Sequence, residues 1–391
     1  ECVMAGRAGR RRFGAVRRLP SGRYQARYRT PDGRRHGAPQ TFATKADADR
    51  YLNRVEMELA RGQWVDPSLG RELLGTWAKR YMATTVHLKP KTRASYESLL
   101  RTTILPTFEA MPLGAIRPST VREWVAALSA RGLSPSRIRQ AYNLLGAMLA
   151  LAVTDGRIAT TPCVGVKLPR LPAPKLRYLS AEQVAGLAAA MRPPYGLLVE
   201  VLAYGGLRFG EAAALRRGRC DLLHGRLLVA EALAEVNGRL LFGPPKGHQE
   251  RTVALPASVV AGLAEHLAAN VAADAGALVF TAPDGGPLRY SNFRRRAWNP
   301  AARAAGLVGA TPHLLRHTAA SLLLDAGASV KDVQRQLGHA DAAVTLNVYS
   351  AVIEGRSDDL AERLEGIRQS ATGRRYGTRG ARDLGDRQVR R

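Results

Sequence analysis

The spacing of apolar residues changes along the chain, beginning with a short region of strand period. In residues 23–29, Tyr24, Ala26 and Tyr28 alternate with polar residues, and Pro-Ser-Gly and Pro-Asp-Gly turns bound the segment. Thr44 then precedes a helical stripe formed by Ala48, Leu52, Val55 and Leu59. Residues 1–65 are therefore predicted to form a module of three strands and one helix, with a basic flexible arm over residues 1–11.

A second region, residues 70–166, has helical period throughout. Prolines near helix starts and glycines at helix ends divide it into four predicted helices; these residues are Pro90, Pro118, Pro135, Gly132 and Gly156. Four prolines then fall in residues 162–174, which is typical of a semi-extended connection. We place an interdomain linker at 167–177.

Helical and strand periods are mixed in the third region, residues 178–367. An apolar helix over 198–204 is broken by a Gly-Gly pair, and a second helix with Glu211 and Leu215 follows. The segments RLLVAEAL, VNGRLLFG and RTVAL predict three strands, with a tight Asn-Gly turn before the second. Helices resume at 257–272 and 291–305. The predicted class is mainly α with small β-sheets (α+β) in three domains, followed by a disordered Arg/Gly-rich tail, 368–391.

The last helices of the third region are marked by strong start and stop signals. Thr311 and Pro312 predict a helix start, and Gly327 predicts its end. Its buried stripe is predicted to contain Leu314, Leu315, Ala319, Leu322 and Leu323. A second helix over 330–337 ends at Gly338, and a short third helix is predicted at 342–348.

The charge of the chain is unusual, although its composition is otherwise that of a globular protein. Lysine and arginine total 59 against 32 acidic residues, a formal net charge of +27. Such an excess indicates a polyanionic partner, and nucleic acid is favoured over a membrane because no apolar run reaches a spanning length. Cys2, Cys163 and Cys220 lack disulfide or zinc spacing, so we expect no metal. The N-terminus has no export signal, which favours a cytoplasmic, nucleoid-associated protein.

Residues 311–349 concentrate the candidate chemistry, in a chain with eight histidines. His313 and Arg316 lie three residues apart, on one helix face, and His339 and Tyr349 follow. Arginine can bind phosphate oxygens, histidine can transfer a proton, and tyrosine can attack phosphorus, which together suit a phosphodiester substrate. The neighbouring His317 is better interpreted as a packed, non-catalytic residue.

Two further candidates stand outside this stretch, each with a structural alternative. Arg208 follows the Gly-Gly pair and could reach an anion, or could be satisfied by Glu211. Lys246 lies in the loop between the second and third strands, where a lysine is usually just solvated.

Basic residues also gather where DNA contacts are expected. One face of the first module carries Arg23, Arg27 and Arg29, and the alternative is that they only solvate the sheet. Two helix starts in the second region carry Lys89, Lys91, Arg93, Arg137 and Arg139, although a plain helical bundle is also compatible. The triplet Arg294, Arg295 and Arg296 is predicted to contact the DNA backbone.

Taken in order, Arg208, Lys246, His313, Arg316, His339 and Tyr349 form a set that resembles the tyrosine recombinases, the phage integrases of the lambda integrase type. The resemblance covers the chain: an arm-type DNA-binding module, a SAM-like core-binding domain and a catalytic domain. It implies that Arg208 and Arg316 clamp the scissile phosphate, with Glu211 supporting Arg208. Lys246 would protonate the 5′-oxygen, His313 and His339 would assist proton transfer, and Tyr349 would form a 3′-phosphotyrosyl link. The loop around Lys246 varies slightly from the family pattern.

The resemblance predicts a site-specific DNA recombinase that integrates, and in the reverse direction excises, a phage or integrative element without metal, ATP or other cofactor. Its partners would be duplex DNA at core and arm-type attachment sites, a homotetramer on that DNA, and DNA-bending or directionality proteins. One alternative is a chromosome-dimer resolvase or topoisomerase-like enzyme, against which the extra N-terminal module argues. Another is a non-catalytic DNA-binding regulator, against which the complete set of six residues argues.

Overall fold

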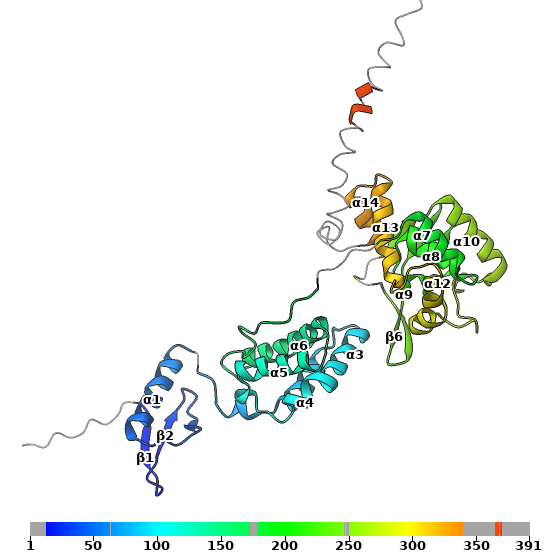
Figure 1. Cartoon of the computed structure of the whole chain (residues 1–391). Coiled ribbons are helices and arrows are strands. Elements are labelled where there is room, and N and C mark those ends of the chain that lie inside the picture. Colours follow the sequence, from blue (N-terminus) through cyan, green and yellow to red (C-terminus); the bar gives the residue numbers. More distant parts are fainter. Residues whose placement is uncertain are drawn as a thin grey trace, which may run out of the picture. The chain divides into compact units, whose positions relative to one another are not determined.

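The computed structural model describes residues 13–62, 64–172, 178–245, 247, 250–338, 364–366 and 368–369. The chain divides into two compact units, Glu1–Ala173 and Pro174–Arg391 (Figure 1). Among the described residues, no helix is both long enough and apolar enough to cross a membrane.

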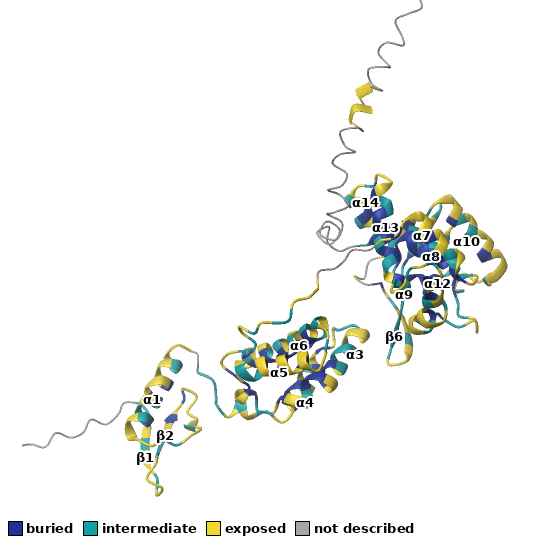
Figure 2. Ribbon diagram, in the orientation of Figure 1, coloured by how far each residue is buried: buried dark blue, intermediate teal, exposed yellow. Residues whose placement is uncertain are grey.

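The first unit begins with an antiparallel sheet of order β1-β2-β3, formed by β1 (Ala15–Arg18), β2 (Tyr24–Arg29) and β3 (Arg35–Gly37). Helix α1 (Lys45–Ala60) packs on β2, and Figure 2 shows buried positions on both elements. Thr44 caps α1 as predicted, because its hydroxyl accepts a hydrogen bond from the Asp47 amide at 3.1 Å. The alternation of β2 is also confirmed: Ala26 and Tyr28 are buried, whereas Arg27 and Arg29 are exposed.

The helical part of this unit contains α2 (Leu74–Thr84), α3 (Pro90–Leu99), α4 (Leu105–Phe108), α5 (Pro118–Ala130) and α6 (Pro135–Thr154). A short 3₁₀ turn, η1 (Leu69–Arg71), precedes α2, and another, η3 (Leu113–Ala115), lies between α4 and α5. The predicted proline starts of three helices are confirmed. A core that includes Trp77, Phe108 and Trp124 holds the helices together.

A π-helical segment, η2 (Leu100–Ile104), joins α3 to α4, and a second one, η5 (Arg294–Trp298), joins α11 (Tyr290–Phe293) to α12 (Asn299–Ala304). Each segment is followed at once by a helix with a proline in its first turn, Pro106 or Pro300. Proline lacks an N–H and its ring crowds the carbonyl four residues earlier. A wider turn before the proline relieves this conflict, so the helical path continues.

In the second unit α8 (Tyr195–Gly205) is central and packs against α7 (Ala181–Ala189), α10 (Ala257–Asn270) and α13 (Pro312–Asp325). Helix α14 (Val330–Leu337) packs on α13, and its end at Gly338 is confirmed. A small sheet has the order β4-β5-β8, formed by β4 (Cys220–Asp221), β5 (Arg226–Val229) and β8 (Arg251–Ala254). Strands β6 (Ala232–Val236) and β7 (Arg239–Gly243) form a separate hairpin.

Three local predictions in this unit are wrong. RLLVAEAL is two strands rather than one, because β5 pairs with β8 whereas β6 pairs with β7. The helix predicted through Leu215 ends early: α9 (Phe209–Ala212) is a single turn, and a 3₁₀ turn, η4 (Arg217–Arg219), follows. The buried stripe of α13 is broader than predicted, since α13 packs on both α8 and α14. Thr318, Ser321 and Leu324 are buried, while Leu314, Leu322 and Leu323 are only partly so.

Candidate active site

The C-terminal end of α8 requires the second glycine of its Gly-Gly pair. Gly206 has a φ of 69°, in the left-handed region that favours glycine. A Cβ on this residue would lie 2.3 Å from Leu337 Cδ2 and 3.2 Å from Ala319 Cβ. Only glycine therefore lets α8 end directly against α13 and α14, and Arg208 follows two residues later.

Arg316 joins these three helices from the inside. It lies on α13 and is 3% exposed. Its Nη1 donates to the carbonyl of Gly206 at 2.8 Å, and its Nη2 donates to the carbonyl of Leu337 at 2.6 Å. Carbonyls at helix C-termini carry partial negative charge, so they are good partners for a guanidinium. The position and the plane of Arg316 are thus set by backbone atoms.

Glu211 holds two other arginines at the same junction. Its carboxylate accepts from the Arg208 amide at 2.9 Å and from Arg208 Nη1 at 2.8 Å. It also accepts from Arg251 Nη2 at 2.6 Å and Nη1 at 3.2 Å. Burial alone would raise the pKa of Glu211, but the hydrogen bonds and charges of Arg251 and Arg208 outweigh it and hold the pKa below its usual value. Arg208 therefore has a fixed orientation, although 26% of its side chain stays exposed.

Arg251 was missed in the sequence, where it is one arginine among many. On β8 it alternates with exposed Thr252 and Ala254 and shares the inner face with buried Val253. A charged residue on the same face of a strand as a buried apolar residue is the signal that could have identified Arg251. Its Nε donates to the carbonyl of Gln336, near the end of α14, at 3.1 Å.

His313 and His317 have different environments on α13. His313 is exposed in the first turn, one turn before Arg316, whereas His317 is partly buried. Their rings are close to perpendicular, with centroids 5.1 Å apart. Burial, followed by the charges of His313 and Arg316, lowers the pKa of His317. Partial burial and a lowered pKa agree with the interpretation of His317 as a packed, non-catalytic residue.

The structure thus brings Arg208, Glu211 and Arg316 together at the junction of α8, α13 and α14. Lys246, His339 and Tyr349 lie outside the described residues. Strands β7 and β8 flank Lys246 in sequence, and Gly338 directly precedes His339. Within the described part of the chain, no group of three or more histidine, cysteine or acidic residues could hold a metal ion.

Several of the candidate DNA contacts also have partners within the protein. Arg23 donates to the hydroxyl and the carbonyl of Thr41, both at 2.7 Å. Arg93 pairs with Glu97 at 3.2 Å. In the same helical part, Arg137 donates to Ser98 Oγ and Arg139 to the carbonyl of Pro169, each at 3.2 Å.

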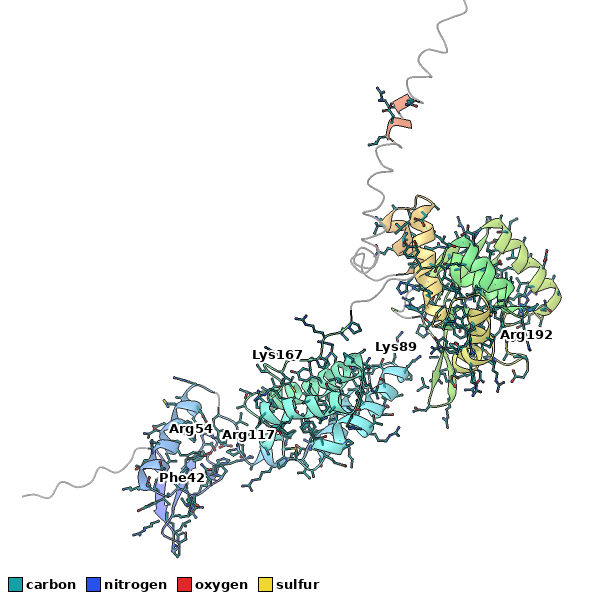
Figure 3. All side chains as sticks on the ribbon, in the orientation of Figure 1. Phe42, Arg54, Lys89, Arg117, Lys167 and Arg192 are labelled. Carbon is teal, nitrogen blue, oxygen red and sulfur yellow. The ribbon has the colours of Figure 1, made fainter. Side chains whose placement is uncertain are left out.

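The remaining candidate contacts are more open. Lys91, Arg294, Arg295 and Arg296 are exposed, as are Arg27 and Arg29. Lys89 is partly buried and lies directly before α3 (Figure 3). Exposure of the first six allows contact with an extended anion, although Arg27 also donates to Gln25 Oε1 at 3.0 Å.

Three family models cover most of the chain. The model of the phage integrase N-terminal domain matches residues 12–61, the N-terminal SAM-like domain of phage integrases matches 73–129, and the phage integrase family matches 177–356. The protein named prophage phiRv2 integrase of Mycobacterium tuberculosis is 31% identical over 379 residues, which cover 94% of this chain and 99% of that one. The chain belongs to the phage integrase family. It is a site-specific tyrosine recombinase, and the predicted family and enzyme class are confirmed.

Solved structures share the fold of this integrase. The transposon Tn1549 integrase in complex with transposon right end DNA has a TM-score of 0.65 at 18% identity, covering 74% of this chain and 100% of that one. A lambda integrase tetramer bound to a Holliday junction has a TM-score of 0.54 at 20% identity, covering 86% and 96%. The predicted mainly helical α+β class with a three-part architecture is confirmed.

Proposed function

We propose that this integrase cuts and rejoins duplex DNA through a covalent bond between Tyr349 and a 3′-phosphate. The observation that carries the proposal is the convergence of Arg208 and Arg316 at one helix junction, each fixed by several hydrogen bonds. Two guanidinium groups held in place suit the non-bridging oxygens of a phosphodiester.

In the proposed step, the Tyr349 oxygen attacks phosphorus and the bond to the 5′-oxygen breaks. The phenolic proton passes to an imidazole, with His313 and His339 as candidates, and Lys246 protonates the departing oxygen. A tyrosine of pKa about 10 is only about 0.1% ionised at neutral pH, so nearby positive charge and a proton acceptor are both needed. Each fixed donor to the developing charge lowers the barrier by about 3–4 kcal/mol.

Rejoining is the reverse reaction. A 5′-hydroxyl attacks the phosphotyrosine and gives its proton to the neutral Lys246 amine, while the tyrosine leaves with a proton returned from the imidazole. The phosphotyrosyl bond keeps the energy of the broken phosphodiester, so the proposed cycle uses no ATP. Arg208 and Arg316 supply the fixed positive charge that both steps require.

The proposed partner is duplex DNA, bound at core sites by the helical part of the first unit and at arm-type sites by the β1-β2-β3 sheet. The net charge of +27 and the DNA-bound structures of similar proteins support this partner. Exchange between two duplexes requires four cuts, and we propose a homotetramer on DNA with accessory DNA-bending or directionality proteins. Integration of a phage or integrative element in the nucleoid follows from this assignment.

A covalent trapping experiment tests the proposal. Wild type, Tyr349→Phe and, as a matched control, Tyr376→Phe in the tail would be incubated with the element's attachment-site duplex carrying a nick near the cut site. We expect a denaturation-resistant protein–DNA adduct for wild type and Tyr376→Phe and none for Tyr349→Phe. An adduct that survives Tyr349→Phe would place the nucleophile elsewhere. Tight binding with no adduct in any of the three proteins would instead favour a DNA-binding regulator.

A further inference from the structure

Arg251 connects two parts of the candidate site that are far apart in sequence. Its Nη atoms bind the Glu211 carboxylate, and its Nε donates to the carbonyl of Gln336 near the end of α14. Only 8% of its side chain is exposed. One guanidinium therefore ties the carboxylate that orients Arg208 to the helix that leads into His339.

The contact between β8 and the end of α14 is reinforced by a second residue. The Gln336 side-chain amide donates to the carbonyl of Ala254 at 2.8 Å, and its oxygen accepts from the Ala254 amide at 3.2 Å. Gln336 thus pairs with the edge of β8 as a neighbouring strand would. Gly338 completes the fit, since a Cβ there would lie 2.8 Å from Arg251 Cδ and its φ is 67°.

The charges of this cluster explain why a second arginine is needed. A carboxylate bound by Arg208 alone would neutralise the positive charge that a phosphate requires. With Arg251 sharing the carboxylate, two cations and one anion leave the buried cluster with a net charge of +1. Removing Arg251 would make Glu211 a partner of Arg208 alone and lower that charge to zero.

We propose that Arg251 is a positioning residue for DNA cleavage, which holds Glu211 and the end of α14 so that Arg208 keeps its orientation and its charge toward the scissile phosphate. This inference rests on the proposed function. Arg251 acts through Glu211 and the Gln336 carbonyl rather than by touching the substrate. A displacement of about 1 Å at a reacting group can slow a reaction by about 100-fold, so loss of this link should be visible in the cleavage rate.

The test uses the full chain on two versions of the same nicked attachment-site duplex, one with a normal scissile phosphate and one with an uncharged methylphosphonate there. Single-turnover cleavage rates would be measured for wild type, Arg251→Gln and Arg251→Lys. The control is Arg217→Gln, because Arg217 donates to the carbonyls of Leu267 and Val271 at the end of α10 instead of to Glu211. DNA affinity and thermal unfolding would be measured for each protein.

For Arg251→Gln we expect DNA affinity within about threefold of wild type and a cleavage rate about 10- to 100-fold lower on the phosphate. The defect should be smaller on the methylphosphonate, because a neutral target needs less positive charge. Arg251→Lys keeps the positive charge but loses the planar set of donors, so its cleavage rate should fall about tenfold. The ratio of its cleavage rates on the phosphate and the methylphosphonate should stay near that of wild type. Arg217→Gln should leave the ratio unchanged.

An Arg251→Gln protein with the wild-type rate, or with an equal defect on both substrates, would overturn the proposal. The proposal would also be overturned if Arg217→Gln changed the ratio of the two cleavage rates as much as Arg251→Gln does. If Arg251→Gln does not fold, Arg251→Lys decides, and a wild-type rate in that variant refutes the positioning role. Failure of the wild-type protein to form a covalent adduct would instead refute the proposed function, so the two failures are distinguishable.

Discussion

The arginines of the β1-β2-β3 sheet and those at the junction of α8, α13 and α14 are the same residue type in opposite settings. On the sheet, Arg29 of β2 lies directly opposite Arg35 of β3, and both are exposed. At the junction, Arg316 and Arg251 are almost fully buried, and each contacts the carbonyl of a residue at the end of α14.

The difference shows how burial changes what a positive charge can do. Like charges directly opposite each other destabilise a sheet, so the facing pair of Arg29 and Arg35 does not stabilise the fold. Binding of an external anion by this face is part of the proposed function. A buried guanidinium must instead be satisfied by the protein itself, and it then holds its neighbours in place. Three predictions could break or sharpen this comparison.

The largest effect on cleavage is expected at Arg316. Arg316→Gln removes a charged donor from the carbonyls of Gly206 and Leu337, and we expect a loss of about 3 kcal/mol in the free energy of unfolding. Cleavage of the nicked duplex should fall at least about 100-fold. Thermal unfolding and single-turnover kinetics measure the two effects.

Exposed Arg192 provides the control for that substitution (Figure 3). Arg192→Gln should change the stability by less than about 0.5 kcal/mol and leave cleavage unchanged. Equal losses of stability in the two variants would show that burial of Arg316 does not contribute to stability as argued.

A pH-dependent effect is expected at Glu211. Its pKa is lowered in the folded protein, so its stabilising contribution is complete above the unfolded value of about 4.3 and is lost as the pH falls through the folded pKa. Glu211→Gln should therefore lower the free energy of unfolding by about 3–5 kcal/mol at pH about 7. Thermal unfolding at successively lower pH should show the difference from wild type shrinking below pH about 4.

The matched control for Glu211 is Glu231. It pairs with Arg216 at 2.7 Å, but about a third of each side chain is exposed. Glu231→Gln should lower the free energy of unfolding by less than about 1 kcal/mol. If Glu211→Gln and Glu231→Gln lower the free energy of unfolding equally across the pH range, burial at the junction does not strengthen the ion pairs of Glu211.

The smallest effect on stability is expected on the sheet face. Arg29→Gln removes one of two facing cations, so the free energy of unfolding should stay constant or rise by about 0.2–1 kcal/mol. Binding of arm-type DNA should weaken, and the slope of log affinity against log salt should become shallower by about 1. Titrations at several salt concentrations measure this slope.

Arg54, labelled in Figure 3, offers a comparison on helix α1 rather than on the sheet. Its guanidinium lies over the Tyr51 ring, 5.5 Å from the ring centroid. Arg54→Gln should change the slope of log affinity against log salt less than Arg29→Gln does. An equal change of slope in both variants would show that the sheet face is not the preferred DNA-binding surface of this module.

The sequence determined most of the local structure, because the signals are local. Thr44 caps α1, prolines begin α3, α5, α6 and α13, and Gly338 ends α14. Capping and a fixed proline φ act within one turn of helix, so their outcome does not depend on distant residues. The full ordered set of candidate residues was also enough to indicate the family, which the family models and relatives then confirmed. The set is Arg208, Lys246, His313, Arg316, His339 and Tyr349.

Tertiary structure alone decided where strands pair and that Arg251 joins the site. β5 and β6 are nearly continuous in sequence, yet they join different sheets because their partners, β8 and β7, are different. Arg251 becomes important only because β8 passes beside Glu211 and the end of α14. Such contacts depend on residues 40 and 85 positions away in the chain, and no local pattern of apolar and polar residues encodes them.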